Sequence, residues 1–362
     1  MIPRSWSRLV SLTLAIGWLG GTAPADTLQE GPITAARKKV GEYLAGQHVP
    51  GASIAVARGG AILWSESFGF AHLEHQVPVG RETRFRVGSI SKTLTSVAVA
   101  KLWEEGKLDL DSPVQRYAPT FPVKPYPITT RQLAGHLSGL PHYSAADIVN
   151  AVRYESVTAA LAKFRDRPLL FTPGERFSYS SFGWNLISVV VEGASGEDFL
   201  DYMRRSVFEP FGMRSTIADH YDQIIEHRTA FYQVRPDGRV LNGPAVDNSD
   251  VWAGGGFLST AEDLVRFGHG VLHGSVIGPR AVDLLFTPMT ASAGLSTGYG
   301  LGWRVKELAG RRAVGHGGSH VGATAELLLI PDLDLAVAIL TNSNNRGIDV
   351  LAQEIAGLFA EP

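Results

Sequence analysis

Apolar residues in this chain gather into short runs near both ends and into longer helical patterns between them. Residues 52–57 and 61–68 are two apolar runs separated by an Arg-Gly-Gly turn, which is typical of a β-hairpin. Residues 325–330 and 335–340 repeat this arrangement around a Pro-Asp-Leu-Asp turn. Strands at both ends with helices between them predict one antiparallel sheet built from both termini.

Helical patterns surround these strands. Residues 33–46 and 347–359 are amphipathic, and residues 104–242 are mostly helical stretches separated by loops that contain proline and glycine. Residues 259–262 form a capping box that opens a helix through residue 267. The pattern in 294–303 predicts a loop followed by a strand, leading to a further strand over 313–323.

The most informative stretch is residues 85–102. Gly88 interrupts an extended run, and from Ile90 onward the apolar residues are dense, with no turn signal before Gly106. This pattern predicts a buried helix that is entered at its first turn. Ser89 and Lys92 lie three residues apart, so their side chains share a face of that helix.

Such a pair can act as a nucleophile and its base. A hydroxyl is a poor nucleophile until a neighbouring group takes its proton, and a lysine can do so when burial and nearby cations keep it neutral. The alternative interpretation is a capping serine followed by a surface lysine. The dense apolar residues around Lys92 argue against it, because they would leave an ammonium poorly solvated.

Composition narrows the functional classes. The formal net charge of −2 argues against a nucleic-acid partner and against a polybasic membrane surface. The chain has no cysteine, which excludes disulfides, a catalytic thiol and thiolate metal sites.

The N-terminus has the pattern of a secretory signal. Arg4 and Arg8 precede the apolar run 9–19, and small residues follow up to Ala25. We therefore expect a signal peptide over 1–25 with cleavage after Ala25, export to the bacterial periplasm and no stable membrane span afterwards. The alternative is an uncleaved anchor, although the run is short for a membrane span.

Two further stretches carry chemistry. Tyr179 precedes the apolar helical stretch 184–192, where its hydroxyl could relay a proton if nearby cations lower its pKa. His316 lies in the glycine-rich stretch 313–319, which could let a substrate approach the edge of a strand. Taken singly, each has a simpler interpretation as a residue that packs inside the fold.

Two other patterns are weaker candidates. Residues 294–298 match the nucleophile elbow of α/β-hydrolases, but that elbow needs a strand before it and a helix after it. His72 and His75 suggest a metal pair, yet no third ligand lies nearby in the sequence.

In this order the stretches resemble the serine β-lactamase-like family, which includes penicillin-binding proteins, class C β-lactamases, D-Ala-D-Ala carboxypeptidases, D-aminopeptidases and related esterases. Ser89–Lys92 is similar to its Ser-x-x-Lys motif, 179–181 to its Tyr-x-Asn motif and 316–318 to its Lys-Thr-Gly motif. The resemblance spans about residues 33–360. It is strongest to the mitochondrial serine β-lactamase-like proteins of animals, through stretches 89–110, 136–139, 179–183 and 252–260.

The resemblance implies an α/β fold in which an antiparallel sheet is flanked by helices and an all-helical subdomain is inserted. The α/β part would be about 33–103 and 245–362, the helical subdomain about 104–244, and residues 26–362 one catalytic domain. The active site would lie between the two parts. No metal or organic cofactor is implied.

The resemblance also implies roles in a two-step acyl transfer. Ser89 would attack an amide or ester carbonyl, with Lys92 and Tyr179 handling protons. The backbone N–H groups of Ser89 and Ser319 would form the oxyanion hole. The residues that would contact the substrate are Ser181, His316, Gly317 and Gly318.

Three positions depart from the family motifs. His316 replaces a lysine, so a permanent charge becomes a titratable one. Gly317 replaces a threonine whose hydroxyl would bind a substrate carboxylate, and Ser181 replaces an asparagine. These changes remove polar contacts where a β-lactam or a peptide terminus would dock.

The sequence therefore predicts an exported serine hydrolase that forms an acyl-Ser89 intermediate and cleaves amide bonds of small peptides. An esterase or weak β-lactamase of the same family is the alternative within the enzyme class. A penicillin-binding-like module without turnover is the alternative outside it. The substrate and the oligomeric state stay open.

Overall fold

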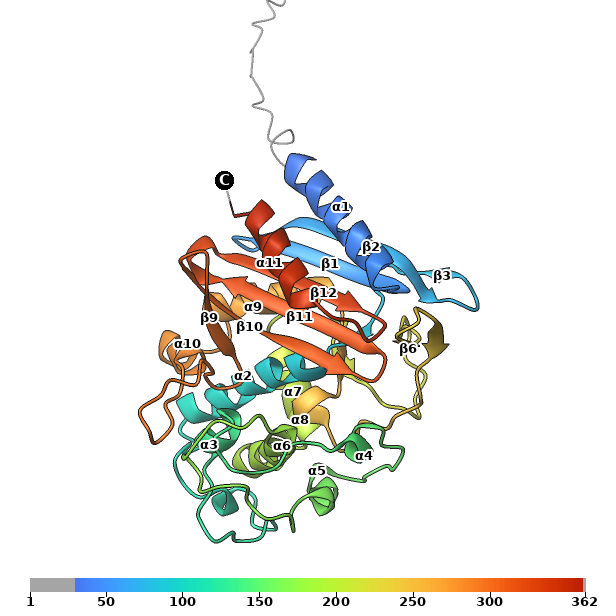
Figure 1. Cartoon of the computed structure of the whole chain (residues 1–362). Helices are drawn as coiled ribbons and strands as arrows, with labels where there is room; N and C mark the ends of the chain where they lie inside the picture. The colour runs from blue at the N-terminus through green and yellow to red at the C-terminus, as the bar shows by residue number, and fades with distance from the viewer. Residues whose placement is uncertain (1–29, 361–362) are drawn as a thin grey trace, which may run out of the picture.

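The computed structural model describes residues 30–360, so the predicted signal peptide lies outside the described residues. Its centre is a seven-stranded antiparallel sheet with the order β3-β2-β1-β12-β11-β10-β9 (Figure 1). Both ends of the chain build it, as predicted. Its strands are β1 (Gly51–Arg58), β2 (Ala61–His72), β3 (Val77–Pro78), β9 (Arg304–Leu308), β10 (Arg311–His320), β11 (Ala323–Ile330) and β12 (Leu335–Thr341).

The two predicted hairpins are confirmed, and they join at β1 and β12. Ile54 pairs with Ile339 in that central ladder. Both faces of the sheet are buried, because successive side chains alternate between two hydrophobic cores. Val337 and Ile339 belong to one core, and Ala338 belongs to the other. This two-sided burial explains why the strands show continuous apolar runs in the sequence.

Helices from distant parts of the chain cover the two faces (Figure 1). The terminal helices α1 (Glu30–Gly46) and α11 (Ile348–Leu358) pack together on one face. On the other face, α9 (Ala261–Leu272) packs against β1 and β12, and α2 (Ser91–Glu104) lies between the sheet and the middle segment of the chain. Most of α2 is buried, as its dense apolar pattern predicts.

The segment predicted as all-helical, 104–244, contains helices joined by long loops and also three short strands between 217 and 242, so it is not all-helical. Helices still predominate among its regular elements, and they lie in the lower part of Figure 1. Its helices are α3 (Thr130–Ala134), α4 (Ala145–Ile148), α5 (Val157–Ala160), α6 (Ser181–Ser195) and α7 (Phe199–Met203). The chain then returns through α8 (Trp252–Gly255), and α10 (Pro279–Phe286) follows α9.

Short strands that the pattern did not predict also occur. They pair in two small sheets outside the main one, of which β4-β8-β5 is the larger. These strands are β4 (Phe85–Arg86), β5 (Ile217–Ala218), β6 (Tyr232–Val234), β7 (Val240–Asn242) and β8 (Phe257–Ser259).

Two predicted boundaries differ from the structure. The N-cap of α9 is Thr260, whose side chain accepts a hydrogen bond from the Asp263 amide, because Ser259 belongs to β8. Helix α9 also continues to Leu272, past the expected residue 267. The strand expected within 294–303 begins only at Arg304, after a loop whose Leu295 is exposed.

Among residues 30–360, no helix combines the length and the apolar character that crossing a membrane would require.

Candidate active site

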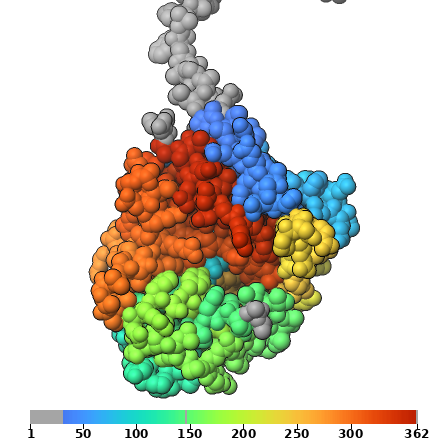
Figure 2. All heavy atoms as spheres, in the orientation of Figure 1, coloured from blue at the N-terminus to red at the C-terminus, as the bar shows by residue number. Residues whose placement is uncertain are grey.

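A cleft of about 790 Å³ separates the sheet from the helical middle segment. Strand β10 and the start of α11 line one side, and residues before α4 and α6 line the other. Figure 2 shows this hollow between the orange-red C-terminal strands and the green middle segment, with teal atoms of the earlier chain at its floor. Ser89, Tyr179, His316 and Ser319 all line it, so the fold brings the three motifs together.

The predicted nucleophile and base are adjacent at the floor of this cleft. Ser89 lies in the 3₁₀ turn Gly88–Ile90, which leads directly into α2. The Lys92 Nζ atom is 3.0 Å from the Ser89 Oγ atom and donates a hydrogen bond of 2.6 Å to the Gly254 carbonyl. Lys92 is fully buried, while Ser89 is partly exposed to the cleft. Burial lowers the pKa of Lys92 well below its usual 10.5, and the positive charge of Arg304 adds to this effect.

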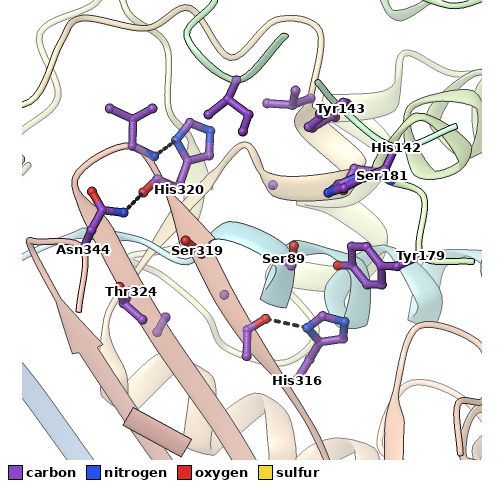
Figure 3. A pocket seen from close by; sticks show the side chains of 18 of the residues that line it. Ser89, His142, Tyr143, Tyr179, Ser181, His316, Ser319, His320, Thr324 and Asn344 are labelled. Carbon is purple, nitrogen blue, oxygen red and sulfur yellow. Dashed lines mark hydrogen bonds between the residues drawn. The ribbon is translucent and has the colours of Figure 1, made fainter. Parts of the chain in front are cut away.

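Tyr179 approaches Ser89 from the other side. It directly precedes Ser180, whose side chain caps α6 by accepting a hydrogen bond from the Gly183 amide. Figure 3 shows the Tyr179 hydroxyl pointing toward Ser89. Burial raises the pKa of Tyr179 to about 12, although Ser89, Arg304 and Ser181 lower it in part. The phenol is therefore protonated at neutral pH and can donate a proton.

Strand β10 lies against the turn that carries Ser89 because two glycines permit a close approach. A Cβ atom on Gly318 would lie 1.9 Å from the Val87 carbonyl oxygen, and one on Gly88 would lie 2.7 Å from the Ser319 amide nitrogen. Gly88 also has a φ of +50°, which favours glycine. The amide of Ser319 is thereby held beside the turn of Ser89, as a two-donor oxyanion hole requires. Figure 3 shows Ser319 on the strand facing Ser89.

His316 is placed in the cleft wall, but both of its ring nitrogens are engaged inside the protein. Its Nδ1 lies 2.6 Å from the Gly317 carbonyl, and its Nε2 lies 2.8 Å from the Tyr299 hydroxyl. Since a carbonyl can only accept, Nδ1 carries the proton and Nε2 accepts from Tyr299. Burial and the charge of Lys92 hold the pKa of His316 well below 6.5. The ring is therefore neutral, and its direct contact with a substrate stays a prediction.

Ser181 begins α6 and is buried at the cleft wall. Its amide donates a hydrogen bond of 3.1 Å to His142 Nδ1. The Tyr143 hydroxyl, which also lines the cleft, donates a hydrogen bond of 2.9 Å to Asn185 Oδ1 in the following turn of α6. The sequence analysis did not single out His142, Tyr143 or Asn185.

His136 is another residue that the sequence analysis left without a role. It is fully buried with a φ of +60°, and its ring centroid lies 4.1 Å from that of Tyr179. Its Nδ1 accepts a hydrogen bond of 3.0 Å from the Ser180 amide. His136 thus fixes the position of Tyr179 from behind. The sequence could have indicated a role for His136, because it lies in the stretch 136–139, which is part of the family resemblance.

The strand wall of the cleft holds two charged residues that the motifs did not reveal. Arg304 begins β9 and is exposed in the cleft, and its charge acts on Lys92, Tyr179 and His316. Glu326 lies on β11 directly opposite Gly317 in the ladder. Glu326 could have been identified from the sequence, because it is the one charged residue within the apolar run 325–330.

Metal donors lie elsewhere. Over residues 30–360, one group has donor atoms close enough together for a metal ion: those of His269, His273 and Asp334 lie within 4.8 Å of one another. None of these residues lines the cleft. The rings of His72 and His75 lie 4.5 Å apart, but the pair is not part of that group.

Comparisons with known proteins agree with this geometry. The profile of the family described as Beta-lactamase matches residues 36–358. The human protein named serine beta-lactamase-like protein LACTB, mitochondrial, is 32% identical over 85% of this chain and 76% of its own length.

Solved structures show the same fold. An octameric penicillin-binding protein homologue from Pyrococcus abyssi superposes with a TM-score of 0.81, at 26% identity over 91% of this chain and 78% of that one. A D-stereospecific amidohydrolase from Streptomyces superposes with a TM-score of 0.76, at 25% identity over 90% of this chain and 98% of that one. With three motifs meeting in one cleft and a profile match over nearly the whole described chain, the protein belongs to the β-lactamase family of serine hydrolases and penicillin-binding proteins.

Proposed function

We propose that this protein is a serine hydrolase that forms an acyl-Ser89 intermediate and cleaves amide bonds of small peptides. The observation that carries the proposal is the fully buried Lys92 amine, 3.0 Å from the Ser89 hydroxyl. The lowered pKa of that amine leaves it able to accept the Ser89 proton. A module that binds without turnover would have no need for a desolvated amine in this position.

The reaction has two steps. Lys92 Nζ takes the Ser89 proton while Oγ attacks the substrate carbonyl, and the developing oxyanion accepts hydrogen bonds from the Ser89 and Ser319 amides. The scissile C–N bond then breaks as Tyr179 gives its proton to the departing amine, and the proton that Lys92 took from Ser89 replaces it, so that the amine and the phenol return to their starting states. In the second step water attacks the acyl ester and gives up a proton to Lys92. That proton passes to the Ser89 Oγ atom as the acyl C–O bond breaks, which releases the carboxylic acid and restores the free hydroxyl.

The resting base is assigned to Lys92 rather than to Tyr179. Burial raises the pKa of the phenol to about 12 and lowers the pKa of the Lys92 amine well below 10.5, so the amine gives up its proton more readily than the phenol does. Each oxyanion-hole donor contributes about 3 kcal/mol to such a transition state. These roles need only groups that already line the cleft.

The strand wall favours a peptide or ester over a β-lactam. Gly317 offers no hydroxyl for a substrate carboxylate, and the ring nitrogens of His316 are already occupied. The amidohydrolase from Streptomyces, by its name, acts on amides with D-stereospecificity. Esterase activity of the same acyl-enzyme is the second candidate, because an ester needs no protonated leaving group.

Intact-mass labelling with a fluorophosphonate probe tests the nucleophile. The wild type should gain one adduct, on Ser89, whereas Ser89→Ala should gain none. Ser91→Ala is the matched control, since Ser91 lies two residues away and is fully buried. An unlabelled wild type, or a label that persists in Ser89→Ala, would end the proposal.

Substrate class is tested with p-nitrophenyl esters, nitrocefin and D-amino-acid peptides assayed side by side. Turnover of peptides supports a peptidase. Turnover confined to the esters would make the protein an esterase and would contradict the peptide proposal.

Export of the mature chain, cleaved after Ala25, is part of the proposal and rests on the pattern of residues 1–25. The animal relatives are named as mitochondrial, which is a statement about those proteins. Sequencing the N-terminus of protein recovered from a bacterial periplasmic fraction tests it. A first residue of Asp26 is expected, and an intact Met1 would contradict cleavage.

A further inference from the structure

One buried acidic side chain in the cleft has no hydrogen-bond or ion-pair partner within the described part of the chain. Glu326 is only 7% exposed, yet among the described residues its carboxylate accepts no hydrogen bond and forms no ion pair. Buried carboxylates are normally paired or hydrogen-bonded, because an isolated charge is costly to bury. An unpartnered one that lines a cleft suggests that its partner is a bound molecule.

The carboxylate fills the space left by the missing side chain of the third motif. Glu326 pairs with Gly317 across the β10–β11 ladder, so the two positions share a face of the sheet. A Cβ atom on Gly317 would lie 2.7 Å from Glu326 Oε2. A threonine at 317, as in the family motif, would collide with the carboxylate unless Glu326 moved. The observed position of the Glu326 carboxylate therefore requires glycine at 317.

The charges around Glu326 do not neutralise it by contact. Arg304 and Lys306 of β9 and Asp349 of α11 all act on its carboxyl from beyond ion-pair distance. Burial outweighs the two cations and raises the pKa of Glu326 to about 7, with Asp349 adding to the rise. At pH 8 most molecules thus carry a poorly solvated negative charge beside Gly317.

We propose that Glu326 is a specificity residue whose carboxylate receives a cationic, hydrogen-bond-donating group of the substrate, such as a primary ammonium, on the side of the carboxylate that faces the cleft. The same charge repels a substrate carboxylate at that place. This inference rests on the proposed acyl-Ser89 chemistry and adds the substrate class to it. Gly317 lacks the threonine hydroxyl that would bind a substrate carboxylate. In its place Glu326 supplies a carboxylate, which binds a cation.

The test uses two series of matched esters at pH 8. In the first series the leaving phenol carries an aminomethyl, an ethyl or a carboxymethyl group on an acetate ester, so that size is kept while charge changes. In the second series the same three groups are placed on the acyl side. The readout is the ratio of kcat/KM for the cationic ester to kcat/KM for the neutral ester within each enzyme variant.

Wild type should prefer the cation over the neutral ester in at least one series, and should disfavour the anion in the same series. Glu326→Gln should lower the cationic-to-neutral ratio about tenfold or more, and should raise the ratio for the anion. Glu307→Gln, an exposed β9 residue outside the cleft, makes the same change in net charge and should leave the ratio unchanged.

Labelling by the fluorophosphonate separates this inference from the proposed function. If wild type and Glu326→Gln are both labelled on Ser89 but share the same cationic-to-neutral ratio, the role of Glu326 is wrong while the acyl-enzyme stands. If the wild type prefers the neutral or the anionic ester in both series, the inference is also overturned. If neither protein is labelled, the proposed function itself fails.

Discussion

The two walls of the cleft differ in whether their buried charged and polar groups already have partners inside the protein. The helix wall, which comprises the turn before α2 at the floor of the cleft and the start of α6, places both Lys92 and Tyr179 against Ser89, and the buried amine also donates to the Gly254 carbonyl. The strand wall, formed by β9, β10 and β11, holds a neutral histidine whose nitrogens are both occupied and a buried carboxylate with no partner among residues 30–360.

The difference teaches how chemistry and recognition are divided in this fold. The helix wall is complete without a substrate, as expected of groups whose task is to move protons between fixed positions. The strand wall has a buried carboxylate that occupies the space beside Gly317 and has no partner among the described residues, as expected of a surface completed by a ligand. Changes to the helix wall should therefore abolish the rate, and changes to the strand wall should alter selectivity and stability.

The largest effect should come from Lys92→Met, which removes the amine from the helix wall but keeps a long side chain. We expect the rate of Ser89 acylation to fall about 10³-fold or more, because general-base catalysis contributes on that scale. Stopped-flow acylation by a p-nitrophenyl ester measures it. Lys101→Met on the same helix is the matched control, since Lys101 pairs with Glu105 and does not line the cleft. A loss below tenfold would mean that Lys92 is not the base.

A second large effect concerns stability on the strand wall. The pKa of Glu326 is raised to about 7 from the usual 4.5, so between these values the folded state keeps a proton that the unfolded state releases. The stability contributed by that proton is fully present below pH 4.5 and is lost as the pH rises through 7. Glu326→Gln has no such group, so it should unfold at higher denaturant than wild type at pH 8.

The size of this difference is bounded by the same linkage. It should approach zero near pH 4.5 and reach at most about 3 kcal/mol at pH 8. Urea unfolding of both proteins at the two pH values measures it. A difference that is equal at both pH values would show that Glu326 is not destabilised as an anion in the folded state.

The Ser89–Lys92 pair of the helix wall could be predicted from the sequence alone, because the two residues are close together in the chain, whereas the role of Tyr179 came from the family resemblance. Ser89 and Lys92 share one helical turn, and spacing alone places their side chains on one face. The strands β1, β2, β11 and β12 were likewise visible as apolar runs, whereas β3 and β9 were not. The N-cap of α9 was misplaced by one residue, because Ser259 also suits a cap and only the pairing of β8 shows that it is in a strand.

The strand wall could be predicted only in part: His316, Gly317, Gly318 and Ser319 were named from the family resemblance, but the place of Glu326 beside them depends on register. Glu326 and Gly317 are nine positions apart in the sequence, and only the pairing of β10 with β11 places one over the other. A shift of one residue would have turned Glu326 to the opposite face of the sheet. The position of Arg304 was missed for a related reason, since its strand starts later than the pattern indicated.

The smallest effect, and the sharpest test of whether the two walls are independent, should come from Arg304→Gln. Arg304 lies on the strand wall, yet its positive charge is the second cause, after burial, of the lowered pKa of Lys92 on the helix wall. Acylation requires the neutral amine, so kcat/KM should rise with pH through the Lys92 pKa. Removing the arginine should move that rise to higher pH, with a loss of kcat/KM of less than about tenfold at neutral pH, because an exposed charge is screened.

The matched control is Arg311→Gln, which makes the same charge change outside the cleft and should leave the pH profile in place. High salt screens Arg304, so it should shift the wild-type profile in the same direction as Arg304→Gln. If the Arg304→Gln profile coincides with that of wild type, the strand wall has no influence on the base, and burial alone lowers the pKa of Lys92.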